Sequence, residues 1–357
     1  MRVLAWVPQA LDTSPGQRFR IEQWEPWLRR DGIEIVYSPF ADRRLADLLK
    51  VSGRFPAKAA GVLRAVARRL AEACRAGRFD LVYVFREGAL LGPAVAERIL
   101  TTGGVPYVFD FDDAIWVRYL SPANSYLSYL RFPSKTAALI RGARHVLAGN
   151  PYLEEYARRH NDAVSVVPTT IDTDKYRMHD RVPSRPVVGW TGSYSTERYL
   201  EIVRPALERL WRRLDFRLVV IGGGAFQADG VEVEHRRWRS ETEVQDLLDV
   251  DVGLMPLEDA EWERGKCGLK ALQYMALGIP VLVSPVGVNV DIVSDGESGF
   301  LARTPEDWEH GLERLLTDQE LRRRMGRAGR QMVERSYSAT AHAPRVAEIF
   351  RRAAEKP

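Results

Sequence analysis

Lys266 and Lys270 lie four residues apart, with Gly268 between them, and together they could hold an anionic group. Residues four apart share one face of an α-helix, so both ammonium groups would point the same way if a helix already begins at Lys266. Positive charges in this position stabilise a phosphate that leaves with its negative charge during a group transfer. A solvated pair of lysines at a helix start is the alternative interpretation.

Two glycine turns could add backbone contacts to a phosphate. Gly192 and Ser193 stand between an apolar run and an amphipathic stretch. A turn in that position can direct N–H groups and hydroxyls towards a diphosphate, although an ordinary capped turn has the same composition. Gly222 opens a run of three glycines, but the run lacks the GxGxxG spacing and is a weak dinucleotide signal.

Asp110, Asp112 and Asp113 place three carboxylates at the end of another apolar run. Carboxylates so spaced can hold a divalent cation through oxygen ligands. Asp112 and Asp113 could instead line a cleft and contact a substrate, or cap a helix over residues 114–119. The residue types alone leave these three uses open.

The candidate residues follow apolar runs that predict the strands of a parallel sheet. In the first half of the chain we predict strands at Val3–Val7, Ile33–Tyr37, Leu81–Phe85, Val105–Phe111, His145–Ala148 and Val164–Val167. Helices are predicted over Phe19–Arg30 and Ala57–Ala76. Strands alternating with helices are typical of a sheet covered on both faces.

The same alternation restarts after the charged, proline-containing segment that ends at Pro186. Strands are predicted at Val187–Trp190, Leu218–Ile221, Val231–Val233, Val252–Met255, Val281–Ser284 and Gly299–Ala302. Helices are predicted at Leu200–Leu214, Glu241–Leu248, Gly268–Leu277, Trp308–Leu316, Glu320–Arg335 and Ala341–Ala354. A chain of 357 residues is also too long for one core, so we predict two α/β domains, 1–180 and 181–337. Ligands of such sheets bind beyond the carboxyl ends of the strands, and two such domains can face each other across a cleft.

Composition places the chain among ordinary globular proteins. The net charge of +4 selects no partner by itself, and no nucleic-acid partner is expected. Two cysteines, Cys74 and Cys267, form no disulfide framework or CxxC metal pattern, which favours a reducing, cytoplasmic setting. No apolar run approaches the length of a membrane helix, and Val3–Val7 is expected to be a strand rather than part of a signal peptide.

The stretch Lys50–Arg78 carries eight lysines and arginines and a single acidic residue, Glu72. Val62, Leu63, Val66 and Leu70 give it an apolar face. A basic amphipathic helix can dock peripherally on an anionic inner membrane surface that bears a lipid acceptor. A solvated helix packed on the sheet is the alternative.

The segment from Lys266 to Val283, KCGLKALQYMALGIPVLV, resembles the nucleotide-sugar-binding signature of family 4 retaining glycosyltransferases, which have the GT-B fold. Four further segments resemble motifs of that family in order and spacing: 167–176, 189–196, 295–301 and the terminal stretch 337–354. The resemblance implies two Rossmann-like domains facing across a cleft, with residues 338–357 as a helix that crosses back to the first domain.

The resemblance assigns donor contacts to both halves of the chain. The implied donor-binding residues are Gly16, Gly192, Ser193, Gly222, Lys266, Gly268, Leu269, Lys270 and Gln273. Gln273 stands where the family has its second Glu, and Gly265 stands where it has the first, unless Glu261 or Glu263 substitutes. Ser193 replaces a family Arg, whose diphosphate role could have passed to Lys266.

In the first half, the implied acceptor contacts are Arg18, Arg20, Arg86 and Glu87, although surface charge or internal pairing would also explain these residues. The implied catalytic residues are Lys266, Asp112 and Asp113, and no resident metal or cofactor is expected. Asp112 stands where the family has a functional His.

The implied reaction moves a sugar from a nucleotide diphosphate sugar to a hydroxyl of a glycan, lipid-linked or small-molecule acceptor, with retention of configuration. Three alternatives remain open at the level of sequence. They are an epimerase or phosphorylase on the same fold, a metal-dependent transferase using Asp110 and Asp112, and a nucleotide-sugar-binding protein with a degenerate site.

Overall fold

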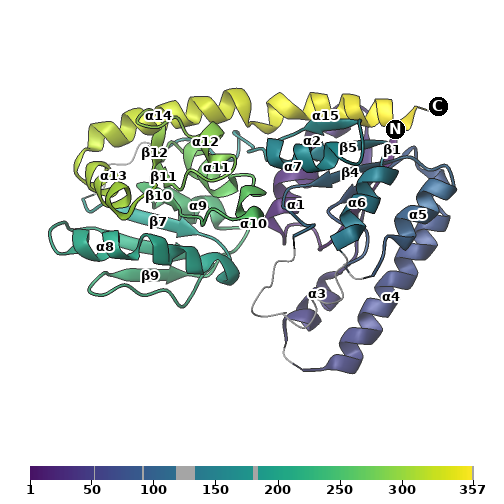
Figure 1. Ribbon diagram of the computed structural model, residues 1–357, viewed down its shortest axis with the longest axis horizontal. Coiled ribbons are helices and arrows are strands. Elements are labelled where there is room, and N and C mark those ends of the chain that lie inside the picture. The colour runs from purple at the N-terminus through teal and green to yellow at the C-terminus, as the bar shows by residue number, and fades with distance from the viewer. Residues whose placement is uncertain (52, 91, 118–132, 180–183, 356–357) are drawn as a thin grey trace. The chain divides into compact units, whose positions relative to one another are not determined.

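The computed structural model describes residues 1–51, 53–90, 92–117, 133–179 and 184–355. The chain divides into two compact units, residues 1–169 with 342–357 and residues 170–341 (Figure 1). The division falls at Thr169, about ten residues before the predicted domain boundary, because residues 170–179 pack on the second unit. The two-unit α/β architecture itself is the one that the sequence predicts.

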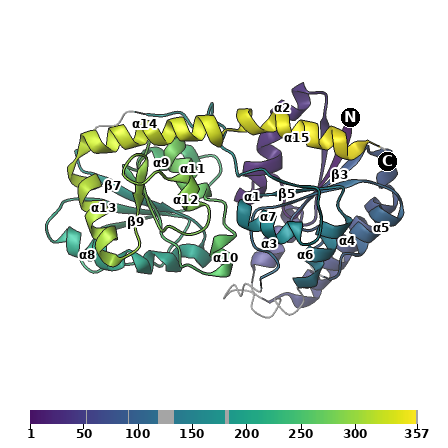
Figure 2. The same ribbon diagram turned by 45° about the horizontal axis from the view of Figure 1, so that its top comes forward.

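The first unit contains a parallel sheet with the strand order β2-β1-β3-β4-β5-β6. Its strands are β1 (Arg2–Val7), β2 (Glu34–Pro39), β3 (Leu81–Phe85), β4 (Tyr107–Phe111), β5 (His145–Ala148) and β6 (Val164–Val166). Every residue of β3 and β4 is buried, because helices flank this sheet on both sides (Figure 2). Continuous apolar runs are the sequence pattern that such doubly covered strands require.

The helices of the first unit differ from the predicted ones in number and in regularity. They are α1 (Pro15–Gln17), α2 (Gln23–Arg30), α3 (Arg43–Lys50), α4 (Phe55–Cys74), α5 (Val95–Thr102), α6 (Pro133–Gly142), α7 (Pro151–Arg158) and α15 (Ala339–Ala354), which begins in the second unit. The predicted helix Phe19–Arg30 is broken by a π-helical segment, Arg18–Glu22, in which Arg20 leaves helical geometry. No helix covers 114–117, and the rest of the predicted stretch 114–119 lies outside the described residues.

The second unit contains another parallel sheet, with the strand order β12-β11-β10-β7-β8-β9. Its strands are β7 (Val187–Thr191), β8 (Arg217–Ile221), β9 (Val233–Arg236), β10 (Val252–Met255), β11 (Val281–Val283) and β12 (Gly299–Leu301). Its helices are α8 (Arg204–Trp211), α9 (Glu243–Leu248), α10 (Glu261–Arg264), α11 (Leu269–Ala276), α12 (Asn289–Ile292), α13 (Pro305–Thr317) and α14 (Gln319–Ser336). One apolar core joins α8 and α13 to one face of this sheet. On β10, the ring of Tyr274 from α11 fills the space beside Gly253.

Two predicted elements of the second unit were wrong in detail. The predicted helix Leu200–Leu214 is a 3₁₀ helix over Tyr194–Ile202 followed by α8, which begins just before Pro205 because proline lacks an N–H and suits a first turn. The predicted strand Val231–Val233 lies slightly later, at Val233–Arg236.

Helix α15 packs against the sheet of the first unit, to which most of its residues belong. Phe350 contacts the ring of Tyr83 with centroids 5.7 Å apart, and Arg351 donates to the carbonyl of Asp31 at 2.8 Å. The terminal helix is therefore part of the core of the first unit.

Helices α3 and α4 pack on each other through a small apolar cluster that includes Leu45 and Ala65. Val62 and Val66 of the predicted apolar face pack against this cluster, and Leu70 is partly buried. Leu63 is 68% exposed and Phe55, at the start of α4, is 64% exposed. No helix in the described part of the chain is long and apolar enough to cross a membrane.

Candidate functional site

The candidate site of the second unit lies at the carboxyl ends of β7 and β8, where two glycine turns touch. A Cβ on Gly222 would lie 2.1 Å from the carbonyl oxygen of Gly192, and Gly222 has a φ of +86°. Gly192 has no room for a side chain either, because a Cβ there would lie 2.4 Å from the indole of Trp190. Only glycine at both positions lets these backbones approach so closely.

The three-glycine run is held by a carboxylate that sequence reasoning missed. Glu197, which is 6% exposed, accepts hydrogen bonds from the N–H groups of Gly224 at 2.8 Å, Ala225 at 3.1 Å and Phe226 at 3.0 Å. The N–H of Gly222 donates to the carbonyl of Arg236 at 2.8 Å. Gly222 therefore shapes the site by close approach, and its own N–H is already bonded within the protein.

The hydroxyls of the Gly192–Ser193 turn bond to one another. The N–H of Ser193 donates to Thr196 Oγ1 at 3.1 Å, and the hydroxyls of Ser193 and Ser195 lie 2.9 Å apart. These bonds are exposed, so this turn is both a cap for the following 3₁₀ helix and a polar surface at the edge of the sheet. The N–H groups of Gly192 and Ser193 are both bonded within the protein, and only the hydroxyls of the turn lie at the surface.

Lys266 and Lys270 reach the site from separate segments. Helix α11 begins at Leu269, and Gly268 before it has a φ of +68°. Lys266 therefore lies outside the helix, so the condition under which the two lysines would share one helix face is not met. The left-handed backbone at Gly268 ends any continuity from α10, and a Cβ there would lie 2.1 Å from Ile292.

The side chain of Lys270 crosses to the end of β7. Its ammonium nitrogen lies 5.7 Å from the centre of the Trp190 ring, the same ring that fills the space beside Gly192. Lys266 lies 5.8 Å from the ring of Trp262. A lysine at the start of α11 and the Gly192 turn thus share one aromatic contact, which brings positive charge to the carboxyl edge of the sheet.

Glu263 is an internal ion-pair partner in this structure. It is 2% exposed, it accepts from the hydroxyl of Tyr199, and Arg198 lies 3.7 Å from its carboxylate. Burial, together with the hydrogen bond to Glu263, raises the pKa of Tyr199 above its usual range. Glu263 is therefore engaged and does not stand in for the carboxylate missing at Gly265, whereas Glu261 is exposed.

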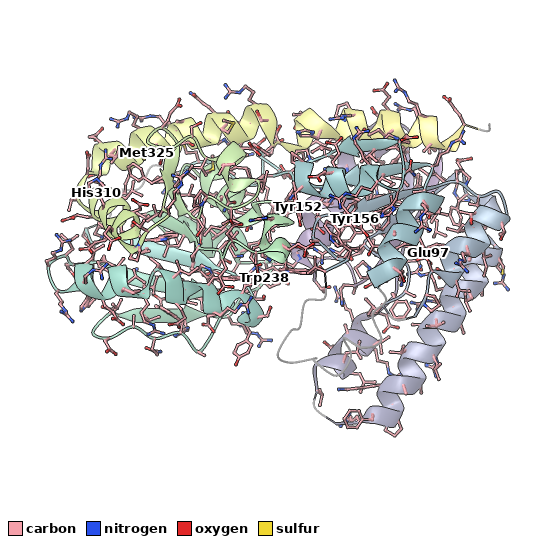
Figure 3. The ribbon with its side chains drawn as sticks, in the orientation of Figure 1. Glu97, Tyr152, Tyr156, Trp238, His310 and Met325 are labelled. Carbon is pink, nitrogen blue, oxygen red and sulfur yellow. The ribbon has the colours of Figure 1, made fainter. Side chains whose placement is uncertain are left out.

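Gln273 belongs to a buried polar network. Its amide donates to the hydroxyl of Tyr176 at 3.1 Å, and that hydroxyl donates to Glu243 at 2.7 Å. Trp238, which Figure 3 labels, donates its indole N–H to the other oxygen of Glu243 at 3.0 Å. With 3% of its surface exposed, Gln273 ties α11 to the segment after Thr170, an environment that its place in the sequence motif did not reveal.

In the first unit, four predicted site residues meet at the carboxyl ends of β1, β3 and β4. Arg86, whose φ is +58°, pairs with Asp112 at 2.6 Å and with Asp113 at 2.5 Å. A Cβ on Gly16 would lie 2.5 Å from Asp112 and 2.8 Å from Arg86. Arg86 is partly exposed, so this charge cluster can contact a ligand at its open side.

Arg20 is buried in the first unit and pairs with Asp110. Its guanidinium lies 2.7–2.8 Å from both carboxylate oxygens, donates to the carbonyl of Val167 at 2.8 Å, and is 0% exposed. Burial alone would lower the pKa of Arg20, but the attraction of Asp110 and their hydrogen bond raise it. The hydroxyl of Tyr83 also donates to Asp110. The sequence predicted that Arg20 contacts an acceptor. That prediction was wrong, because no part of the Arg20 side chain reaches solvent.

The remaining predicted acceptor contacts also have internal partners. Arg18 is 8% exposed and pairs with Asp12 at 2.7 Å. Glu87 pairs with Lys135 at 3.2 Å rather than with its neighbour Arg86. No cluster of three or more His, Cys, Asp or Glu side chains suited to a metal occurs in the described ranges.

Two family models match this chain, one on each half. A model described as Glycosyltransferase Family 4 matches residues 19–175, and one described as Glycosyl transferases group 1 matches residues 185–318. Together they cover most of the chain.

Two curated relatives and one solved structure are similar to this chain. A D-inositol 3-phosphate glycosyltransferase of Stackebrandtia nassauensis is 28% identical over 48% of the chain, and an alpha-D-kanosaminyltransferase of Streptomyces kanamyceticus is 27% identical over 50%. The alignments span less than half of each relative's own length, 45% and 47%. The structure of Anabaena Alr3699/HepE in complex with UDP-glucose is 15% identical, with a TM-score of 0.69 over 99% of this chain and 100% of that one.

Gly222→Ala should destabilise the second unit, because its Cβ would overlap the Gly192 carbonyl on a backbone with positive φ. Overpacking of this kind costs about 1–3 kcal/mol. Gly224→Ala is the matched control, since nothing lies within 4 Å of its Cβ. Denaturant unfolding of both variants measures the difference, and equal free energies of unfolding would contradict the close approach.

Proposed function

This chain belongs to the family 4 glycosyltransferases and has the GT-B fold, and on that premise we propose that it transfers a sugar from a nucleotide diphosphate sugar to an acceptor hydroxyl with retention of configuration. The observation that carries the proposal is the contact of Lys270 with Trp190 beside the Gly192 turn. Through this contact the ammonium group of Lys270, the Gly192 turn and the start of α11 lie close together at one edge of the sheet. Such an edge suits a diphosphate.

The proposed chemistry is a substitution at the anomeric carbon. The acceptor oxygen forms a new bond to that carbon, the bond from the carbon to the diphosphate oxygen breaks, and the acceptor's proton passes to the departing diphosphate. Lys266, Lys270, Ser193 and the N–H groups at Gly268 and Leu269 would stabilise the negative charge of the leaving group. Positive charges from the protein can serve this purpose, and we propose a metal-independent reaction.

The donor class is proposed from this edge of the sheet and from a structural neighbour. The HepE structure is a complex with UDP-glucose, and a similar fold supports a nucleotide-sugar donor for this chain. The exposed side of the Arg86, Asp112 and Asp113 cluster is the proposed polar contact surface for substrate on the first unit. The acceptor is proposed as a hydroxyl of a glycan, a lipid-linked sugar or a small molecule.

A nucleotide-sugar-binding protein without turnover is the second candidate function. Gly265 carries no side chain, Glu263 is engaged with Tyr199, and Gln273 is buried. Gly265 and Gln273 therefore lack the two carboxylates that the family motif uses, and the nearby carboxylate of Glu263 is engaged with Tyr199. The two candidates differ in turnover, and both require nucleotide binding.

A panel of nucleoside diphosphates and their sugars should contain one that raises the melting temperature, because a ligand of the folded state stabilises it by mass action. At about 100 times the dissociation constant the gain is about 2.7 kcal/mol. The panel is measured by thermal unfolding with and without a chelator. A shift that the chelator abolishes would contradict the metal-independent proposal, and no shift with any member would contradict nucleotide-sugar binding.

Lys270→Ala should weaken binding of the selected nucleotide and lower turnover about 100-fold, because it removes positive charge beside the leaving diphosphate. Lys266→Ala should lower turnover by a similar factor. Lys175→Ala is the control, since this lysine is exposed on the same unit away from the turn. Turnover is measured as nucleotide release with an acceptor extract. Wild-type nucleotide binding without any release would favour the second candidate function.

We also propose that α3 and α4 contact the cytoplasmic face of a membrane. Phe55 and Leu63 are exposed, Val51 is 50% exposed, and Lys58 lies 6.0 Å from the ring of Phe55. Exposed apolar side chains among cations match an anionic lipid surface, where apolar burial and attraction to the headgroups add.

Phe55→Ser/Leu63→Ser should reduce co-sedimentation with phosphatidylglycerol vesicles about tenfold or more, since each change removes an exposed apolar group. Val95→Ser is the matched control, being 46% exposed on α5 of the same unit. Equal binding by all three proteins, or equal binding to phosphatidylcholine vesicles, would contradict an electrostatic and apolar docking surface.

A further inference from the structure

A polar recess lies in the second unit, at the amino ends of its strands. Asp251 immediately precedes β10 and Pro280 immediately precedes β11, and both line the recess. The Asp251 carboxylate also accepts from the N–H of Val187, the first residue of β7. The Gly192 and Gly222 turns follow the opposite ends of strands in this sheet, so the recess is separate from the proposed donor site.

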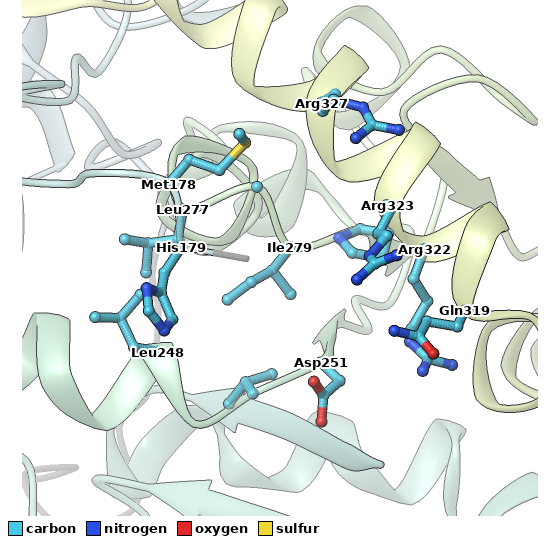
Figure 4. A pocket seen from close by; sticks show the side chains of 13 residues that line it. Met178, His179, Leu248, Asp251, Leu277, Ile279, Gln319, Arg322, Arg323 and Arg327 are labelled. Carbon is cyan, nitrogen blue, oxygen red and sulfur yellow. The ribbon is translucent and has the colours of Figure 1, made fainter. Parts of the chain in front are cut away.

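The recess has an apolar floor and a strongly basic wall. Leu248, Leu277 and Ile279 form part of the floor, and His179 lies across from Arg323 (Figure 4). Arg322, Arg323 and Arg327 come from α14. Asp251 is the only carboxylate among the described residues that line the recess.

The three arginines differ in how they are already bonded. Arg322 is 8% exposed and donates to the carbonyls of Leu315 and Leu316, so its guanidinium is fixed in place. Arg323 donates to Glu320 at 2.9 Å, but its Nε is buried and has no hydrogen-bond partner among the described residues. A buried donor of this kind is costly unless a partner arrives.

Arg327 adds an exposed charge at the rim. No ion pair joins it to a carboxylate within the described part of the chain. It lies one helical turn beyond Arg323, so the two guanidinium groups can approach one ligand from the same side of α14. The carboxylate of Asp251 is already engaged by the Val187 N–H.

We propose that this recess binds a phosphate group, either inorganic phosphate or the phosphomonoester end of a small metabolite. Its volume is about 50 Å³, where a single water needs roughly 10–15 Å³ on the same measure. The space can therefore take one tetrahedral oxyanion. Guanidinium groups recognise phosphate oxygens through paired N–H donors, and the Nε of Arg323 is the donor that lacks a protein partner.

Helix α11 connects the two places. Its first residue follows Gly268 at the proposed donor site, and Leu277 and Gly278, directly after its last residue, line the recess. The phosphate site does not depend on the proposed function, because none of its lining residues belongs to the proposed donor or acceptor contacts.

The test is thermal unfolding of the full chain in increasing inorganic phosphate, with chloride adjusted to hold ionic strength constant. Wild type should show a saturable rise in melting temperature. Arg327→Gln should raise the phosphate concentration for half of the maximal rise about tenfold, as expected for loss of one charge-assisted contact. Arg323→Gln should do the same, and Arg324→Gln, an exposed neighbour that does not line the recess, should behave as wild type.

Several outcomes would overturn the site. They are the absence of a saturable rise, an unchanged phosphate response in both Arg327→Gln and Arg323→Gln, or an equal rise with acetate at the same ionic strength. Lys270→Ala should keep the full phosphate response, and its loss there would place the ion at the donor turn instead. A failed nucleotide panel leaves these expectations unchanged, so the two proposals fail separately.

Discussion

The contact of one backbone with another at Gly222 and Gly192 is the constraint on which the second unit's candidate site depends. Two strands of a parallel sheet deliver their following turns to the same edge, but side chains normally hold such turns apart. Here the absent Cβ atoms let the turn after β8 rest on the carbonyl of the turn after β7. Glu197 then fixes the remaining glycine turn from inside, through three N–H groups. The N–H groups of Gly192, Gly222 and these three residues are all bonded within the protein, so the bonds fix the shape of the edge.

The charged side chains at the carboxyl edges of the two sheets have different kinds of partner. At the carboxyl edge of the first sheet, Arg20 pairs with Asp110, and Arg86 pairs with both Asp112 and Asp113. At the corresponding edge of the second sheet, Lys270 lies over Trp190 and Lys266 near Trp262. A ring face attracts an ammonium group through its quadrupole, whereas a carboxylate attracts a guanidinium group through its full charge. The described contacts of the charged groups at the two edges therefore differ in kind.

Strand positions and the two-unit plan followed from the sequence because doubly covered strands are short, continuous apolar runs. Leu81–Phe85 and Val252–Met255 have the predicted bounds for this reason. Contacts between distant residues could not be predicted in the same way. Arg20 meets Asp110 across 90 residues, and Gln273 meets Tyr176 across 97. Local periodicity does not reveal such pairs, so the sequence did not predict that Arg20 is buried or that Gln273 belongs to a polar network.

Helix α11 runs from the proposed donor site, at its start, to the recess of Arg323 and Arg327, at its end. The N–H groups at the start of a helix favour negative charge, and cations favour its end. At the end of α11, Arg330 of α14 donates to the carbonyl of Ala276 and also to Thr173, which fastens the segment after Thr170 to the helix. Arg323 and Arg327, on the same helix as Arg330, line the neighbouring recess. Helix α14 thus carries arginines of two kinds. Arg330 binds backbone carbonyls of its own unit, whereas Arg323 and Arg327 bring positive charge to the recess.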